Sequence, residues 1–475
     1  MKKAFWGGFA ASAIAGLSVC GASAQQSSAN ATYIPRSQPS TPTESRIGAN
    51  TGRARASAYM QVNPLFSPKL PFRPAPGAYA NPDEQKAVAN KDYAFLLDYY
   101  GKKCPPSAQS FNAMADFLRS GSGVGNCYFL AGLYRDGHGV PADINKALVY
   151  YQTAADGGFW PASVQLAQLY FTGDGVAKDT AKGIDYLVQY TTNVKNAPEG
   201  MCYGTEMLGY VYMKGKYLPA NGAEAEKWYR YCLDKVDKPS DPYPDAFVVH
   251  NLRLLADLYA DENLVPGKLD AAVQSYNRIV TLAGERYYRE DAQPAQRALG
   301  QMYITGHGVP KDVNKGIALL KTAVERTVTD PASAVALYRL YSAGDVIPAD
   351  PAQAAIYLDI AVKANWPEAQ TIAAQNALKA NPPQPDKAKT LLQAAVVTGY
   401  APAQYEFGDY YLKYGSGVSG SVTAYLWFDL AAQNGHADAA KARDALASKL
   451  SADNLKQVAA AEVQLKTKYP EIVAD

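Results

Sequence analysis

Histidine and cysteine are scarce in this chain, with four histidines and five cysteines among 475 residues. Their spacing gives no CxxC, CxxH or HExxH, the short motifs in which zinc ligands usually occur. The GxSxG turn of a serine nucleophile and the SxxK of β-lactamases are also missing. His138 and His307 occupy the same position in two separate turns, so we expect both to be solvated turn residues. The sequence therefore predicts no catalytic residue, no metal site, no cofactor and no enzymatic activity.

An excess of charge of one sign is lacking too, since 46 Lys and Arg stand against 44 Asp and Glu. Residues 1–24 hold two lysines and no acid, so without them the count is 44 of each sign. Binding to nucleic acid or to an anionic membrane needs clustered cations, and the composition argues against both. Beyond the N-terminus no apolar run approaches the ~20 residues that cross a bilayer, which predicts no membrane span in the mature chain.

The first 24 residues are typical of a secretory signal peptide. Two lysines precede an apolar run that ends in small residues, which favours cleavage after Ala24. Lipidation of Cys20 is the alternative, but Val19 stands where a lipoprotein usually has a small residue. Residues 25–82 are rich in Ser, Thr, Pro and Ala with little periodic apolar pattern, so we expect a disordered linker. The sequence predicts an exported protein, most simply a periplasmic one.

Four cysteines remain after such cleavage, and an even number in an exported protein favours disulfides. If Cys202 begins one helix of an antiparallel pair and Cys232 ends the other, both lie at the same end and can reach bridging distance. Cys104 and Cys127 would then join the N-terminal helices to the first clear repeat. Four free thiols are the alternative reading of the same residues.

A glycine-rich turn recurs between segments that have helical periodicity. It reads YRDGHGV at 134–140, and related turns follow at 170–176, 303–309 and 411–418. Glycine supplies the positive φ that ends a helix, so the repetition favours a joint between helices over a phosphate-binding loop, which would need a preceding strand or a P-loop motif. The predicted turn glycines are Gly137, Gly139, Gly173, Gly175, Gly306, Gly308, Gly415 and Gly417.

A short polar residue follows each of these turns, and others recur where the glycines are lost. Asp, Asn and Ser at an N-cap accept hydrogen bonds from the first turn of a helix. Asp350 has the strongest pattern, because Pro351 follows it and Gln353 stands three residues on. The predicted caps are 35 to 49 residues apart and comprise Asp143, Asp179, Asn221, Asp270, Asp312, Asp350, Asp386 and Ser421.

The two best copies, AGLYRDGHGVPADINKALVYYQTAADGG at 131–158 and RALGQMYITGHGVPKDVNKGIALLKTAV at 297–324, resemble the Sel1-like repeat, a relative of the tetratricopeptide repeat. The resemblance implies an all-α fold, a right-handed α-solenoid of about eight to nine helix-turn-helix repeats. We expect a degenerate helical hairpin at 83–125, repeats over 126–450, and a C-terminal capping helix and tail over 451–475.

Proteins of this kind are scaffolds, so the resemblance implies a periplasmic scaffold that binds another envelope protein, in signalling, secretion or exopolysaccharide assembly. The alternative is binding of a cell-wall or exported glycan by surface aromatics. Tyrosine is abundant at 35 residues, and most tyrosines follow the repeat. Aromatic side chains outside that register suit either partner because they bury a large area at a small entropy cost. The candidates for a ligand-facing role are Tyr287, Tyr288, Trp366 and Tyr400.

Overall fold

A computed structural model describes residues 82–104, 124–193, 198–237, 246–282, 289–325 and 329–473. The predicted signal peptide, nearly all of the predicted linker, and Tyr287 and Tyr288 lie outside these ranges. In the part of the chain that the structure describes, all regular secondary structure is helical, which confirms the predicted fold class.

Two compact units divide the chain within one helix, after Ala295, and we describe each unit by itself. The helices of the N-terminal unit are α3 (Pro82–Asn90), α4 (Tyr93–Lys103), α6 (Val124–Asp136), α7 (Ile144–Asp156), α8 (Trp160–Thr172), α9 (Thr180–Asn193), α10 (Pro198–Lys214), α11 (Gly222–Val236), α12 (Ala246–Ala260) and α13 (Leu269–Leu282). Helix α14 (Arg289–Thr305) begins in this unit and continues into the next.

The helices of the C-terminal unit after α14 are α15 (Val313–Val324), α16 (Pro331–Ala343), α17 (Pro351–Lys363), α18 (Pro367–Lys379), α19 (Pro385–Val396), α20 (Ala401–Tyr414), α21 (Gly417–Gln433), α22 (Ala439–Ala447) and α23 (Ala452–Lys468), followed by the 3-10 turn η4 (Pro470–Ile472).

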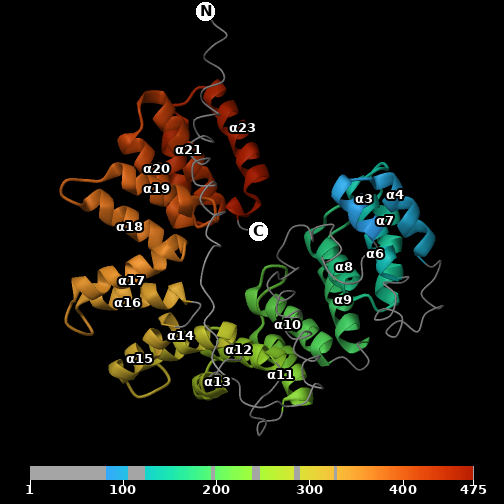
Figure 1. Cartoon of the computed structure of the whole chain (residues 1–475), viewed down its shortest axis with the longest axis horizontal. Helices are drawn as coiled ribbons and strands as arrows, with labels where there is room; N and C mark the ends of the chain where they lie inside the picture. Colours follow the sequence, from blue (N-terminus) through green and yellow to red (C-terminus); the bar gives the residue numbers. More distant parts are fainter. Residues whose placement is uncertain are drawn as a thin grey trace, which may run out of the picture. The chain divides into compact units, whose positions relative to one another are not determined.

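Within each unit, most helices pack against the helices next to them in sequence, while α23 packs against α21 (Figure 1). The closest pairs are α6 with α7, α8 with α9, α10 with α11, α12 with α13, α16 with α17, α18 with α19, and α20 with α21. Each pair is one hairpin, and contacts such as α7 with α8 or α19 with α20 join it to the following one. The expected array of helical hairpins is therefore confirmed, while the right-handed sense of its superhelix stays a prediction.

The glycine turns place residues of positive φ directly after the first helix of a hairpin. Gly137 and Gly139 have φ of 68° and 75°, and the same conformation recurs at 173, 175, 306 and 308. The prediction is wrong for Gly415, whose φ is −76°. A side chain there would collide with the carbonyl of Tyr411 and with Gly420, so helices α20 and α21 approach too closely for the usual two-glycine turn.

Five of the predicted caps accept a hydrogen bond from a backbone N–H of the first turn that follows them. Asp350 caps α17 twice, through the amides of Ala352 and Gln353 at 3.1 and 3.0 Å. Each of the others accepts from the residue three positions on, and these caps are Asp143, Asp179, Asn221 and Asp312. Each of these hydrogen bonds therefore fixes the start of a helix and contributes about 1 kcal/mol to stability.

Three predicted caps are wrong. Asp270 lies in the first turn of α13, because Gly267 with φ of 76° ends the loop early and the helix begins at Leu269. Asp386 also lies inside its helix, since α19 begins with Pro385 and Gln384 stands at the N-cap. Ser421 is the fifth residue of α21, which begins already at Gly417.

The first part of the hairpin expected at 83–125 forms two helices, α3 and α4. Lys91 has φ of 56°, and Asp92 then caps α4 by accepting from the amide of Phe95 at 3.1 Å. Residues 105–123 of the expected hairpin lie outside the described ranges, and α4 packs against α6. Two disulfides brace this unit: Cys104–Cys127 joins α4 to α6, and Cys202–Cys232 joins α10 to α11, with Cα separations of 4.8 and 4.9 Å.

Small residues let the two helices of a hairpin approach closely. A Cβ added at Gly209 in α10 would overlap three ring atoms of Tyr229, which lies on α11 and is fully buried. At Gly316 in α15 it would meet the backbone oxygen of Gly300. The core is made of alanines, leucines and tyrosines arranged around such contacts.

Among the described residues, no helix combines the length and apolar character that crossing a bilayer requires.

We expect Gly209→Ala to destabilise the N-terminal unit by about 2 kcal/mol, because the buried ring of Tyr229 cannot yield without leaving its packed position. Gly101→Ala is the matched control: Gly101 lies in α4, and an added Cβ would meet no atom within 4 Å. The control should gain about 0.5–1 kcal/mol from helix propensity. Urea denaturation followed by circular dichroism measures both, and equal midpoints for the two variants would contradict the close-approach account.

Candidate functional site

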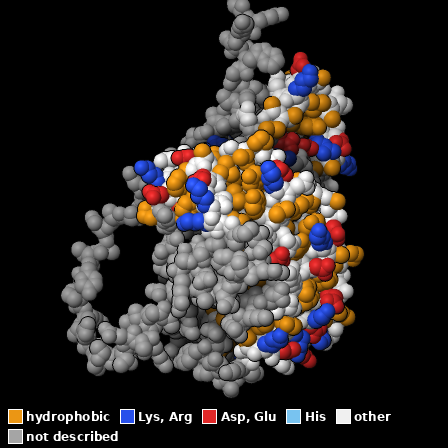
Figure 2. All heavy atoms as spheres, turned by 90° about the vertical axis from the view of Figure 1, so that its right-hand side faces the viewer, with side chains coloured by type: hydrophobic (Ala, Val, Ile, Leu, Met, Phe, Trp, Pro, Cys, Tyr) orange, Lys and Arg blue, Asp and Glu red, His pale blue; other side chains and the backbone are white. Residues whose placement is uncertain are grey.

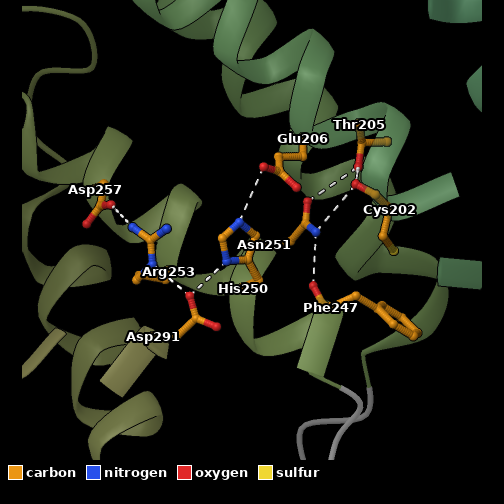
Figure 3. A network of polar contacts seen from close by, with 9 residues as sticks. All are labelled: Cys202, Thr205, Glu206, Phe247, His250, Asn251, Arg253, Asp257 and Asp291. Carbon is orange, nitrogen blue, oxygen red and sulfur yellow. Dashed lines mark hydrogen bonds and ion pairs between the residues drawn. The ribbon is translucent and has the colours of Figure 1, made fainter. Parts of the chain in front are cut away.

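A polar network connects α10, α12 and α14, the first helices of three consecutive hairpins, within the N-terminal unit (Figure 3). His250 on α12 is its centre, with Nδ1 2.8 Å from Oδ1 of Asp291 on α14 and Nε2 3.4 Å from Oε1 of Glu206 on α10. Arg253, one helical turn after His250, donates through Nε to the same Asp291 oxygen at 2.8 Å and pairs with Asp257. The side chains are 11 to 34% exposed, so solvent screens these pairs only weakly.

The electrostatics of this network keep its members charged. Burial by itself lowers the pKa of His250, but the hydrogen bonds to Asp291 and Glu206 and their charges outweigh it and raise that pKa to about 10. For Asp291 burial has the opposite sign and by itself raises the pKa. The hydrogen bonds and charges of His250 and Arg253 outweigh burial and bring that pKa below its usual value. His250 is therefore a cation at neutral pH and acts as an ion-pair partner, unsuited to accept a proton there.

A second set of polar contacts connects α12 to the disulfide hairpin. Asn251 is buried and donates through Nδ2 to the carbonyl oxygens of Cys202 and Phe247, at 3.4 and 2.9 Å. Its Oδ1 accepts from the hydroxyl of Thr205 at 3.4 Å. His250 thus connects α12 to α10 and α14, and the adjacent Asn251 adds a second connection to α10. The arrangement suits a structural joint between repeats. In the part of the chain that the structure describes, no group of side chains is suited to bind a metal ion.

Sequence reasoning missed this network. The signal was present in VVHNLRLLADLY, because 250, 253 and 257 recur at i, i+3 and i+7 and so share one helix face with no apolar role. It also missed Asp330, which caps α16 by accepting from the amide of Ser333 at 3.0 Å and also binds Arg297. The Asp-Pro pair at 330–331 repeats the pattern at 350–351 and would have identified that cap.

The turn histidines are more than solvated residues. His138 stacks on the ring of Tyr93, with centroids 4.7 Å apart and planes 8° from parallel. His307 lies with Nε2 3.4 Å from a carboxylate oxygen of Glu262. In both turns the residue between the glycines reaches back to the preceding hairpin. The side chain of His307 is 50% exposed and that of His138 is partly exposed, so both are in reach of solvent as expected, and each also contacts the preceding hairpin.

Two of the four candidate aromatics have a defined place in the C-terminal unit. Trp366 stands at the N-cap of α18 and Tyr400 at the N-cap of α20, and both are half-buried against the hydrophobic core. Phe159 occupies the same position before α8. These aromatics therefore follow the repeat, because each stands at an N-cap without a side-chain hydrogen bond, where a proline in the first turn fixes the helix start.

A polar cluster surrounds these two aromatics. Glu368 on α18 accepts from Nε1 of Trp366 at 3.4 Å and pairs with Arg339 of α16, whose side chain is 66% exposed. Burial, and then the charge of Glu368, raise the pKa of Tyr400, while Arg339 opposes this. The first helices of successive hairpins are connected in the same way further along, where Gln375 of α18 donates to Glu406 of α20 at 2.6 Å.

The surface elsewhere carries charge of both signs. On the face drawn in Figure 2, the described Lys and Arg side chains lie beside Asp and Glu side chains, with hydrophobic patches between them. Some lysines form cation–π contacts with tyrosine rings. In one of them, Nζ of Lys182 lies 4.3 Å from the ring centre of Tyr170. This agrees with the balanced composition and offers a mixed surface, of the kind that protein partners contact.

The family model of the Sel1 repeat matches six segments, at 127–159, 160–189, 203–231, 293–327, 332–366 and 401–436. Each matched segment contains most of one helical hairpin of the structure. The chain belongs to the Sel1 repeat proteins. The hairpin α12/α13, which contains most of the polar network, and the hairpin α18/α19 stand between matched Sel1 repeats and keep the architecture without the consensus.

Solved structures of Sel1 repeat proteins are similar to this chain. One is a Sel1 repeat protein from Oxalobacter formigenes, 20% identical, covering 79% of this chain and 98% of its own with a TM-score of 0.44. Another is a protective antigen with an SLR fold from uropathogenic Escherichia coli, 18% identical, covering 83% of this chain and 96% of its own with a TM-score of 0.38. The repeats make this chain a scaffold protein, and its two disulfides indicate an oxidising compartment.

Proposed function

We propose that this Sel1 repeat protein is an exported, periplasmic scaffold that holds another envelope protein, in signalling, secretion or exopolysaccharide assembly. The observation that carries the proposal is the cluster of Arg339, Trp366, Glu368 and Tyr400 on consecutive repeats of the C-terminal unit. Tryptophan, tyrosine and arginine dominate the binding energy of protein interfaces, and here all three lie beside one carboxylate. The two disulfides and the predicted signal peptide support the compartment.

The repeat architecture also supports a role in binding without catalysis. Stacked hairpins offer an extended surface in which neighbouring repeats each contribute part of a site. In the network at His250 the charged groups pair with one another and serve the joint between repeats. We therefore propose a non-enzymatic function, with the partner recognised by charged and aromatic side chains.

Affinity capture tests the docking surface. The full mature chain is cross-linked to an envelope extract of the source bacterium, and captured proteins are identified by mass spectrometry. We expect a defined protein whose recovery falls at least tenfold with Arg339→Glu and with Trp366→Ala. Lys363→Glu is the control, because Lys363 is 75% exposed on α17 and belongs to a surface ion pair with Asp359. Unchanged capture by both test variants would refute this docking surface.

A separate pair of variants tests the glycan alternative. Trp366 and Tyr400 are held against the core, so a flat and open stacking platform is less well supported than a protein contact. Retention of the chain on peptidoglycan or on exported polysaccharide, lost with Tyr287→Ala and Tyr288→Ala, would favour glycan binding over the scaffold. That pair of tyrosines stays a prediction, since it lies outside the described residues.

A further inference from the structure

The chain ends with a short segment that folds back onto the C-terminal unit. Helix α23 ends at Lys468, and Tyr469, with φ of −129° and ψ of 82°, turns the backbone into η4. Ile472 is fully buried, whereas Pro470 and Glu471 are exposed. Tyr469 and Val473 pack against the edge of the same hydrophobic core. One aliphatic side chain therefore anchors the segment.

Two side-chain amides bind the backbone of this segment. Gln404, fully buried on α20, donates through Nε2 to the carbonyl oxygen of Ile472 at 2.8 Å. Asn434, at the C-cap of α21, donates through Nδ2 to the same oxygen at 2.8 Å. The slot between α20 and α21 thus recognises a main-chain carbonyl together with an apolar side chain, as peptide-binding sites do.

The slot keeps its hydrogen bonds without the segment. Nε2 of Gln404 also donates to the carbonyl oxygen of Val396 at 3.2 Å, and Nδ2 of Asn434 donates to Oε1 of Gln404 at 2.7 Å. Each amide therefore retains a partner when Ile472 leaves, which avoids the cost of an unsatisfied buried donor. A site held in shape in this way loses little entropy when a peptide binds.

We propose that this slot is a peptide-binding site, in which residues 469–473 act as an intramolecular ligand that a segment of a partner protein, folded into the same 3-10 turn, can replace. Departure of residues 469–473 removes only the 3-10 turn η4 and breaks no α-helix, since α23 ends before them. The partner segment carries an isoleucine or a similar aliphatic anchor and a free carbonyl at that residue, while the two preceding positions face solvent and accept polar residues. The inference stands independently of the docking surface at Trp366.

The test uses a fluorescent peptide of residues 468–475 and a chain that ends at Lys468. We expect the shortened chain to bind the peptide at least tenfold more tightly than the full chain, in which the segment competes. Ile472→Ala in the peptide should abolish binding, and Glu471→Ala should leave it unchanged because that side chain is exposed. Fluorescence anisotropy measures every combination of chain and peptide, with circular dichroism to verify that the shortened chain stays helical.

A full-length Ile472→Ala variant serves if shortening unfolds the chain, since it frees the slot and keeps the rest of the tail. It should bind the peptide more tightly than the wild type does. Failure of both folded variants to bind, or equal binding of the peptide that carries Ile472→Ala, overturns the proposal. Dimerisation of the wild type that Ile472→Ala removes in light scattering would support the slot and identify a second copy of the chain as the donor.

Discussion

Asp291→Ala should lower the free energy of unfolding of the N-terminal unit by about 3 kcal/mol, the range found when one partner of a buried ion pair is removed. Its Oδ1 holds both His250 and Arg253 at 2.8 Å, so the substitution leaves two partly buried cations with only Glu206 and Asp257 to balance them. Urea denaturation at pH 7, followed by circular dichroism, measures the change in midpoint.

Asp98→Ala is the matched control for this experiment. Asp98 pairs with Lys102 at 2.7 Å within α4 of the same unit, but the two side chains are 63 and 74% exposed. Exposed pairs of this kind contribute less than about 0.5 kcal/mol. A loss with Asp291→Ala no larger than that of the control would mean that the network contributes nothing to the joint between α12 and α14.

The contrast between these two aspartates also explains which parts of the structure could be predicted from the sequence. The hairpins follow from local signals, because a cap such as Asp143 and the glycines before it act on residues within one turn. Those interactions need no partner from another repeat. The fold class and most helix starts were therefore predictable from the residues alone.

The errors occur where distant segments decide the local structure. Ser421 has the sequence of a cap, but α20 and α21 approach closely and the helix begins four residues earlier, at Gly417. Asp386 loses its role to the proline before it. In the network, Asp291 lies 41 residues from His250, and no spacing within a single repeat announces such a pair.

Candidate binding residues were harder to judge, because an aromatic side chain looks alike in sequence whether it packs or faces a ligand. Trp366 and Tyr400 each pack against the core and also border Glu368, so a role in binding stays a prediction for both. The slot for Ile472 could not be foreseen at all. Its two amides come from different helices and meet only once α20 has packed against α21.

Replacing both Cys202 and Cys232 with alanine should cost about 3–4 kcal/mol of stability, since the bridge closes a loop with a sequence separation of 30 residues. Both cysteines are fully buried, so alanine avoids placing an unpaired hydroxyl in the core. The same hairpin contains the close contact at Gly209 and receives Asn251 through the carbonyl of Cys202. Loss of the bridge should therefore loosen α10 against both α11 and α12.

Reduction provides the control and connects stability to the compartment. With dithiothreitol the wild type should unfold at a denaturant concentration close to that of the reduced double variant, to the extent that the Cys104–Cys127 bridge is lost in both. Without reductant only the wild type should keep the higher midpoint. If reductant leaves the wild-type midpoint unchanged, the bridges do not contribute to stability, and the argument for an oxidising compartment loses its physical basis. A large shift means that the protein reaches its full stability only where disulfides persist, as expected for a scaffold that works outside the cytoplasm.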